Sequence, residues 1–189
     1  MKALCIADLH SEETCIEYSR KFLEAEKPEI VLIAGDFTTN GPIDFVEDVL
    51  EVFKDAKVFA VHGNNDTMRV KNFLIEKKIS VHSRAEEYHG LRFVGYGGSP
   101  PTPFNTLIEY PEAIIEKDLK PLTDSNTILL THAPPFKTKA DCLRDGKHIG
   151  SHAISNVIYA KKPLACFCGH VHETQGFETI LRTKIFKIP

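Results

Sequence analysis

The chain has 189 residues, the length of one ordinary domain, and its hydrophobic content of 42% is enough for a buried core. Its formal net charge of −3, with 23 basic residues spread along the sequence, argues against a surface that wraps a long nucleic acid. No apolar run approaches the roughly 20 residues that span a bilayer, and the first residues turn acidic before a signal-peptide core could form. We therefore expect no membrane partner and a cytoplasmic location.

The five cysteines are scattered and lack CxxC spacing, which is typical of reduced thiols rather than of disulfides or a thiolate zinc site. Cys166 and Cys168 lie in one apolar run, and strand alternation places both on the same face, where we expect them to be packed. The cysteines therefore receive no catalytic role.

The first part of the sequence alternates between strand and helix patterns. Three apolar runs that end in polar residues predict buried strands: residues 2–8, 29–36 and 57–66. Residues 11–26 carry apolar positions, Phe22 among them, spaced as on a helix, and Pro42 precedes a second helix. The inner face of that second helix is expected to include Phe45, Val46, Val49, Leu50 and Phe53. A third helix is predicted over residues 68–77.

The middle of the sequence changes pattern. Residues 86–98 predict a hairpin that turns near His89 and Gly90, and residues 99–104 form a proline-broken loop that we expect at a rim or cap. The remaining predicted elements are a helix at residues 111–117, a strand at 126–132, a loop at 133–150, a helix from Ser151, a strand at 163–172, and a hairpin of 175–181 and 184–188.

Alternating strands and helices followed by antiparallel strands predict a layered α/β domain with a mixed sheet, or with two sheets packed face to face between helices. The sequence contains no internal repeat, linker or low-complexity segment. We therefore expect a single domain that spans residues 1–189.

Polar side chains with metal-binding ability follow the predicted strands. In open α/β sheets, groups at the carboxyl ends of strands converge in one cleft, even when they are distant in sequence. A lone histidine has an ordinary structural explanation, but five strand ends that all carry such groups are not required by core packing, which disfavours buried charge. The predicted ligands are Asp8, His10, Asp36, Asn64, His132, His170 and His172.

The mixture of carboxylate, imidazole and amide oxygen favours an intermediate divalent metal over a soft one or an all-oxygen cage. We expect Mn²⁺, with iron, zinc, nickel or magnesium as alternatives. A carboxylate can join two ions about 3.5 to 4 Å apart, the spacing at which metals bind a phosphoryl group and deprotonate a water. Asp36 is the expected bridge.

The motifs DLH, GDF, GNND, TH and GHVH resemble those of the calcineurin-like metallophosphoesterases over nearly the whole chain. The resemblance implies a four-layer α/β/β/α sandwich. It also implies one metal bound by Asp8, His10, Asp36 and His172, and a second metal bound by Asp36, Asn64, His132 and His170. The GDF and GNND stretches further resemble small prokaryotic phosphodiesterases, and THAPPF with HIGSHAI resembles metallophosphoesterase-domain proteins that act on cyclic nucleotides.

One position departs from the family pattern. Asn65 occupies the place of the histidine that protonates the leaving group, and an amide cannot donate its proton at neutral pH. General acid assistance is typically worth about 10²- to 10⁴-fold, so its loss penalises monoesters with poor leaving groups more than diesters or activated esters.

His148 and His152 are candidates to replace the missing acid, because their loop could fold over the cleft. Gly150 and Ser151 stand just before a helix whose free N–H groups would favour an anion. The alternative is that Ser151 only caps this helix and both histidines are solvated. Asp66 is a further candidate, as a carboxylate that orients a ligand by a hydrogen bond.

The leading interpretation is a phosphodiesterase in which a hydroxide bridging two divalent metals attacks a small phosphorylated substrate, such as a cyclic nucleotide or another phosphodiester. The alternatives are a phosphomonoesterase or protein phosphatase, and a non-catalytic scaffold that retains the fold. A nuclease is disfavoured by the unremarkable charge. Exposed-looking apolar residues such as Phe104, Leu107 and Phe136 fit either a pocket or a homodimer contact.

Overall fold

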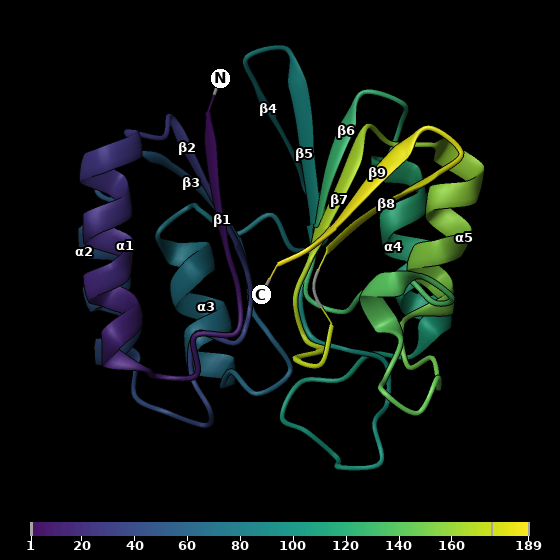
Figure 1. Cartoon of the computed structure of the whole chain (residues 1–189), viewed down its shortest axis with the longest axis horizontal. Coiled ribbons are helices and arrows are strands. Elements are labelled where there is room, and N and C mark those ends of the chain that lie inside the picture. The colour runs from purple at the N-terminus through teal and green to yellow at the C-terminus, as the bar shows by residue number, and fades with distance from the viewer. Residues whose placement is uncertain (1, 175, 189) are drawn as a thin grey trace.

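Two sheets pack face to face, with helices on both outer faces, in the computed structural model of the chain, which describes residues 2–174 and 176–188 (Figure 1). The smaller sheet has the order β1-β2-β3, and its strands pair in parallel. The bounds of these strands are Ala3–Ile6 for β1, Ile30–Ala34 for β2 and Lys57–Val61 for β3. All five residues of the central strand β2 are buried, as expected for a strand covered on both faces.

The larger sheet has the order β4-β5-β6-β7-β9-β8. Its inner strands pair in parallel, whereas β4 and β8 at the two edges are antiparallel to β5 and β9, so this sheet is mixed as predicted. The bounds are Ala85–Tyr88 for β4, Leu91–Tyr96 for β5, Thr127–Thr131 for β6, Ala165–Cys168 for β7, Gly176–Ile180 for β8 and Thr183–Lys187 for β9.

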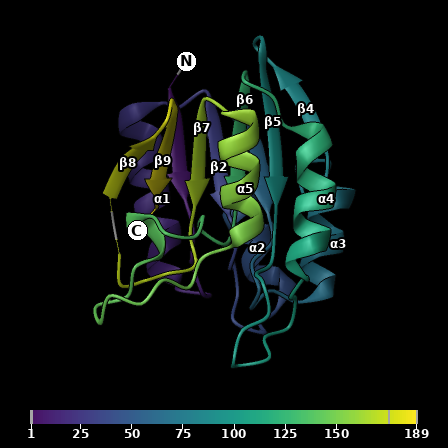
Figure 2. The same ribbon diagram turned by 90° about the vertical axis from the view of Figure 1, so that its right-hand side faces the viewer.

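Five α-helices of the described chain cover the outer faces (Figures 1 and 2). Three of them lie on the smaller sheet: α1 (Glu13–Glu26), α2 (Ile43–Val52) and α3 (Met68–Glu76). The other two lie on the larger sheet: α4 (Glu112–Leu122) and α5 (His152–Lys161). The four-layer α/β/β/α sandwich is therefore confirmed. Among the residues that the structure describes, no helix is long and apolar enough to cross a membrane.

Three apolar clusters fill the spaces between the layers. The middle one joins the two sheets, where the rings of Phe59 on β3 and Phe93 on β5 stack at 4.2 Å between centroids. Burial of one such side chain contributes about 1.5 to 3 kcal/mol. Cys166 and Cys168 both lie in the cluster beneath α4 and α5, which confirms that they share a packed face.

Several predicted elements differ in detail. The helix predicted to end at residue 117 continues to Leu122 through Pro121, because the fully buried Leu119 anchors its last turns to the core. Phe22 is 47% exposed, since α1 covers the sheet edge without burying any residue completely. The predicted loop at residues 133–150 contains a short 3-10 turn, η1 (Lys139–Asp141). Gln175, where the last hairpin was predicted to begin, lies outside the described residues.

A polar aromatic cluster lies beneath the GNND loop. His82 accepts a hydrogen bond from the Gly97 N–H at its Nδ1 atom, and its ring lies 4.6 Å from the rings of both His62 and Tyr96. Burial, together with the charge of Lys71, lowers the pKa of His82 to about 4. A proton on Nδ1 would also break the hydrogen bond from Gly97, so the folded chain keeps this imidazole neutral.

This burial makes stability depend on pH. Between pH 6.5 and 4 the unfolded chain protonates His82 while the folded chain does not, so the free energy of unfolding falls as the pH decreases through this window. The contribution of His82 is on the order of 3 kcal/mol. We expect His82→Gln to lose less stability over the same window in urea titrations with a chelator present. Equal losses in the two proteins would contradict this assignment.

Candidate metal centre

The strand ends that carry the predicted ligands are tied together by backbone hydrogen bonds. Asp8 N–H donates to Gly35 O at 3.0 Å, which joins the loops after β1 and β2. Gly169 N–H donates to His132 O at 3.0 Å, which joins the loops after β7 and β6. His170 N–H donates to Asp8 Oδ2 at 2.9 Å, and this contact links the two sheets. The structure thus brings the predicted ligand loops to one edge.

Asp36 lies at the centre of the site. Its carboxylate is 1% exposed, and its Oδ2 atom is 3.7 Å from His10 Nε2 and 3.5 Å from His132 Nε2. Burial alone would raise the pKa of Asp36, but His132 and the N–H groups of Asn65 lower it overall. One carboxylate oxygen between two imidazoles of different loops is the arrangement expected of a bridging ligand.

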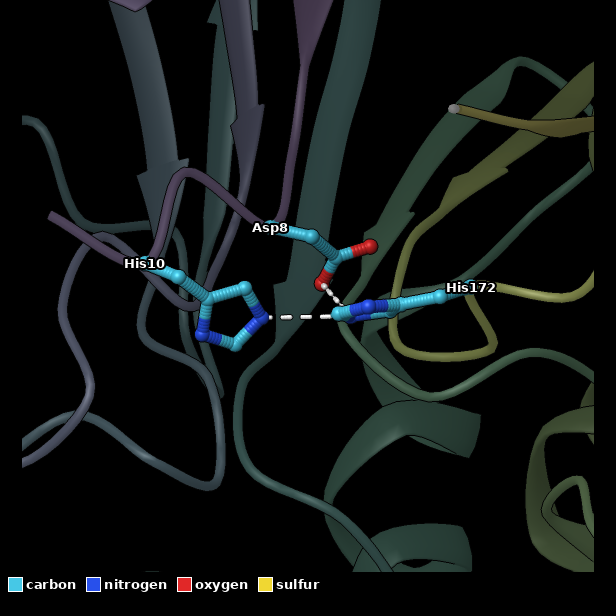
Figure 3. Close-up of side chains that lie close together, drawn as sticks. All are labelled: Asp8, His10 and His172. Atoms are coloured by element: carbon cyan, nitrogen blue, oxygen red, sulfur yellow. Dashed lines mark hydrogen bonds and ion pairs between the residues drawn. The ribbon is translucent and has the colours of Figure 1, made fainter. Parts of the chain in front are cut away.

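The first half of the site contains Asp8 and His10 from the loop after β1 and His172 from the loop after β7, and the three side chains point toward one another (Figure 3). The Nε2 atoms of His10 and His172 are 3.1 Å apart, and His172 Nε2 is 4.0 Å from Asp8 Oδ1. The other nitrogen of His10, Nδ1, is 2.7 Å from Thr39 Oγ1, which fixes the orientation of the ring.

The second half contains His132, Asn64 and His170. His132 Nδ1 is 2.8 Å from Ala34 O, and because a carbonyl oxygen only accepts, this nitrogen carries the proton. When the ring carries only this proton, its Nε2 atom has a free lone pair, and it lies 2.7 Å from Asn64 Oδ1 and 3.2 Å from His170 Nδ1. Burial and the neighbouring His132 lower the pKa of His170 to about 3, so the His170 ring is neutral at pH 7.

These donor atoms fit divalent cations. The lone pairs of Asn64 Oδ1 and His132 Nε2 face each other at 2.7 Å, an arrangement that a cation between ligands satisfies and that a neutral pair does not. Neutral imidazoles with carboxylates and an amide oxygen are the ligands that intermediate divalent metals prefer. The Asp36 carboxylate approaches one histidine of each half, since its Oδ2 atom is 3.7 Å from His10 Nε2 and 3.5 Å from His132 Nε2.

The backbone of the site is strained. Four of the predicted ligands have positive φ angles, a conformation that costs residues other than glycine of order 1 kcal/mol or more and that clusters at functional sites. The four residues are Asp8 (φ 55°), His10 (47°), Asp36 (51°) and His170 (72°). The backbone of Gly63 lies directly against the Asp36 side chain, because a Cβ added at Gly63 would be 1.9 Å from Asp36 Oδ1.

Asp66 joins two ligand loops. Its buried carboxylate accepts hydrogen bonds from the Gly63 N–H at 2.8 Å and from the Thr38 N–H at 2.8 Å. Burial raises the pKa of Asp66, and the hydrogen bond from Gly63 partly opposes this rise. Asp66 was predicted to orient a ligand directly, but its partners are backbone amides and Thr38. It positions Asp36 and Asn64 through their loops.

Asn65 contacts Asp36 twice. Its backbone N–H donates to Oδ1 at 2.9 Å, and its side-chain amide donates to Oδ2 at 2.7 Å. At the position where the family pattern has a proton-donating histidine, this chain therefore has a residue that fixes the orientation of the central carboxylate.

The predicted anion site at the start of α5 is already filled. Glu112 of α4 accepts hydrogen bonds from the Ser151 hydroxyl at 2.7 Å and from the N–H groups of His152 and Ala153, both at 2.9 Å. The expectation of a substrate anion there is wrong, because a carboxylate of the chain occupies the free N–H groups. Ser151 caps the helix through the Ile154 N–H, as the alternative interpretation held.

The two candidate histidines lie on either side of one aromatic ring. His152 stacks on Phe136 at 3.8 Å between centroids, and His148 lies edge-on to the same ring at 6.0 Å. Within residues 2–174 and 176–188 neither histidine makes a hydrogen bond or ring contact with a predicted ligand, so their role stays a prediction.

Lys187 was not predicted as part of the site. Its side chain on β9 is 1% exposed, its Nζ atom is 3.6 Å from Asp8 Oδ2, and it also donates to Ile188 O. Strand alternation could have located it, because Lys187 lies two residues after the buried Ile185 and therefore on the same inward face.

Comparison with known proteins identifies the family. The profile of the calcineurin-like phosphoesterases matches residues 1–174, which include all seven predicted ligands. The chain belongs to this family. Membership makes it a metal-dependent phosphoesterase, a hydrolase of phosphoric esters.

Proteins similar to the chain have varied descriptions. An uncharacterized protein of Methanocaldococcus jannaschii is 32% identical over 191 residues, which cover 97% of this chain and 85% of the relative. A probable glycerophosphodiester phosphodiesterase of Arcobacter nitrofigilis is 26% identical over 160 residues, which cover 77% of this chain but only 57% of that protein. A crystal structure from Thermus thermophilus has a TM-score of 0.75 at 17% identity, covering 98% of this chain and 87% of that one.

The Lys187–Asp8 pair yields a prediction about stability. Removing one partner of a buried ion pair costs about 3 to 5 kcal/mol, because the other charge is left uncompensated. We expect Lys187→Met to lower the free energy of unfolding by this amount in chelator, and by less with saturating Mn²⁺, which also neutralises Asp8.

Lys184 provides the matched control, since it lies on the same strand and is exposed. Lys184→Met should change stability by less than about 0.5 kcal/mol in either condition. If urea titrations showed the same small effect for Lys187→Met, the ion pair would make no contribution to the free energy of unfolding.

Proposed function

We propose that the chain is a phosphodiesterase that acts on a small phosphodiester, with cyclic nucleotides among the possible substrates, and that it works with two divalent ions, preferentially Mn²⁺. Bound ions of this kind neutralise phosphate oxygens and acidify a water so that it can attack phosphorus. The observation that carries the proposal is the position of Asp36 Oδ2 between His10 and His132, which supports two adjacent ion sites.

The residues around the ions have separate tasks in this proposal. His132 carries its proton on Nδ1 and donates a hydrogen bond from it to Ala34 O, so the Nε2 lone pair faces the site. Asn65 orients Asp36, and Asp66 fixes the two loops that carry Asp36 and Asn64. These contacts hold the ligand atoms in place before substrate binds, which reduces the cost of ordering them during the reaction.

The preference for diesters has two supports. Asn65 cannot donate a proton to a leaving group, and its side chain is engaged with Asp36, so a monoester with a poor leaving group depends on a proton donor elsewhere in the site, whereas an activated diester does not. The relative from Arcobacter nitrofigilis is described as a probable glycerophosphodiester phosphodiesterase, although the chain spans only 57% of that protein. The competing proposals are a phosphomonoesterase or protein phosphatase, and a non-catalytic scaffold.

The proposal is tested by Mn²⁺-dependent hydrolysis of bis-p-nitrophenyl phosphate, p-nitrophenyl phosphate and an alkyl monoester. We expect the diester to be the best substrate by kcat/KM, and we expect Asp36→Ala to reduce turnover by at least about 10³-fold, because both ion sites lose a shared ligand.

Two results would contradict the proposal. Faster hydrolysis of the alkyl monoester than of the diester would favour a phosphomonoesterase. Absence of turnover on every ester, with ions bound, would favour the scaffold. Asp48→Ala is the control, because Asp48 is an exposed acidic residue of α2, outside the loops that carry the ligands.

A further inference from the structure

A buried carboxylate and a half-exposed histidine form a pair in the loop before α5. Asp141 is 0% exposed, and its Oδ1 atom accepts a hydrogen bond from His148 Nδ1 at 2.7 Å. Because a carboxylate oxygen accepts, the Nδ1 atom donates and the Nε2 atom points away from Asp141. The side chain of His148 is 32% exposed, and no hydrogen bond from the described part of the chain engages Nε2.

The carboxylate does not need the histidine as a structural partner. Asp141 also accepts from the Thr138 N–H at 2.8 Å and from the Gly150 N–H at 2.9 Å, so backbone amides already satisfy both of its oxygens. The loop is thus held from inside by Asp141. The imidazole adds a titratable nitrogen at its surface, oriented by a fixed carboxylate, which is the arrangement used in general acid and base catalysis.

This loop is attached to two segments that carry metal ligands. Arg144 N–H donates to Glu173 Oε2 at 2.9 Å, and Glu173 directly follows His172. On the other side, Ser151 N–H donates to Pro134 O at 2.8 Å, two residues after His132. The loop therefore contacts the segments that follow β6 and β7, at the end of the molecule where these strands finish (Figure 1).

We infer that His148, oriented by Asp141, is the general acid of this enzyme and supplies the proton that Asn65 cannot. The inference rests on the proposed phosphodiesterase function. Water loses one proton to solvent, the resulting hydroxide attacks phosphorus, and as the bond from phosphorus to the leaving oxygen breaks, the Nε2 proton of the His148 imidazolium moves to that oxygen. The alcohol leaves neutral, and the imidazole regains a proton from solvent.

His152 has no such orienting carboxylate among the described residues. It stacks on the same ring of Phe136, but its backbone N–H is bound by Glu112, and no carboxylate among the described residues contacts its imidazole. The two histidines therefore form a natural comparison: both lie against Phe136, and only one has a carboxylate that orients it.

The decisive experiment measures how the loss of His148 depends on the leaving group. The substrates are methyl p-nitrophenyl phosphate, methyl phenyl phosphate and an alkyl phosphodiester of glycerol, assayed with Mn²⁺ as kcat/KM. The variant is His148→Gln, whose side-chain amide can still donate to Asp141 but cannot supply a proton. His152→Gln is the matched control, and melting temperatures confirm that each variant folds.

A general acid gives a graded result. We expect His148→Gln to hydrolyse the p-nitrophenyl diester within about tenfold of the parent, since p-nitrophenolate leaves without a proton, and to lose about 10²- to 10⁴-fold on the alkyl diester. His152→Gln should lose no more than about threefold on every substrate. Added imidazole should restore part of the alkyl activity in His148→Gly.

Failure of the His148 inference can be distinguished from failure of the proposed function. Equal losses on all three diesters would show that His148 only braces the loop, and no loss on the alkyl diester would show that it takes no part; either result overturns the inference. If the parent chain hydrolysed none of the diesters, the proposed function itself would fail.

Discussion

The carboxylate of Asp36 connects every part of the site. Its Oδ2 atom lies between His10 and His132, which come from different sheets, and Asn65 holds both of its oxygens. Asp66 fixes the loop of Asp36 to the loop of Asn64. Because this carboxylate is buried, it is stable as an anion only with opposite charge and N–H donors nearby. The fold supplies the donors, and bound cations would complete the charge balance.

The same constraint explains the energetic features around the site. Four of the predicted ligands have strained backbone conformations, and a buried lysine on the last strand pairs with Asp8. Such features lower stability unless the surrounding structure compensates for them. Here the two packed sheets, joined by the stacked rings of Phe59 and Phe93, provide the rigid support on which strained loops can be held. A precise ligand arrangement thus depends on an apolar interface.

That the seven predicted ligands lie at one edge could be predicted from the sequence, because each follows an apolar run with the pattern of a strand, and parallel strands end at one edge. The layers could be predicted for the same reason, with help from the family resemblance. Contacts between side chains of distant elements could not be predicted from the sequence. Glu112 closes the anion site of α5 from another helix, and Asp141 reaches His148 only because a 3-10 turn places it there. Neither contact changes the spacing of apolar residues from which helices and strands are predicted.

We propose that the chain holds two divalent ions, one on each side of Asp36. The most direct measurement is a calorimetric titration of the metal-free chain with Mn²⁺, followed by electron paramagnetic resonance of the loaded protein. We predict two ions per chain with an exchange-coupled signal, since ions joined by one carboxylate lie about 3.5 to 4 Å apart. We also predict that Asp36→Asn binds at most one ion without coupling. A single ion in the parent chain, or two uncoupled ions, would contradict the claim.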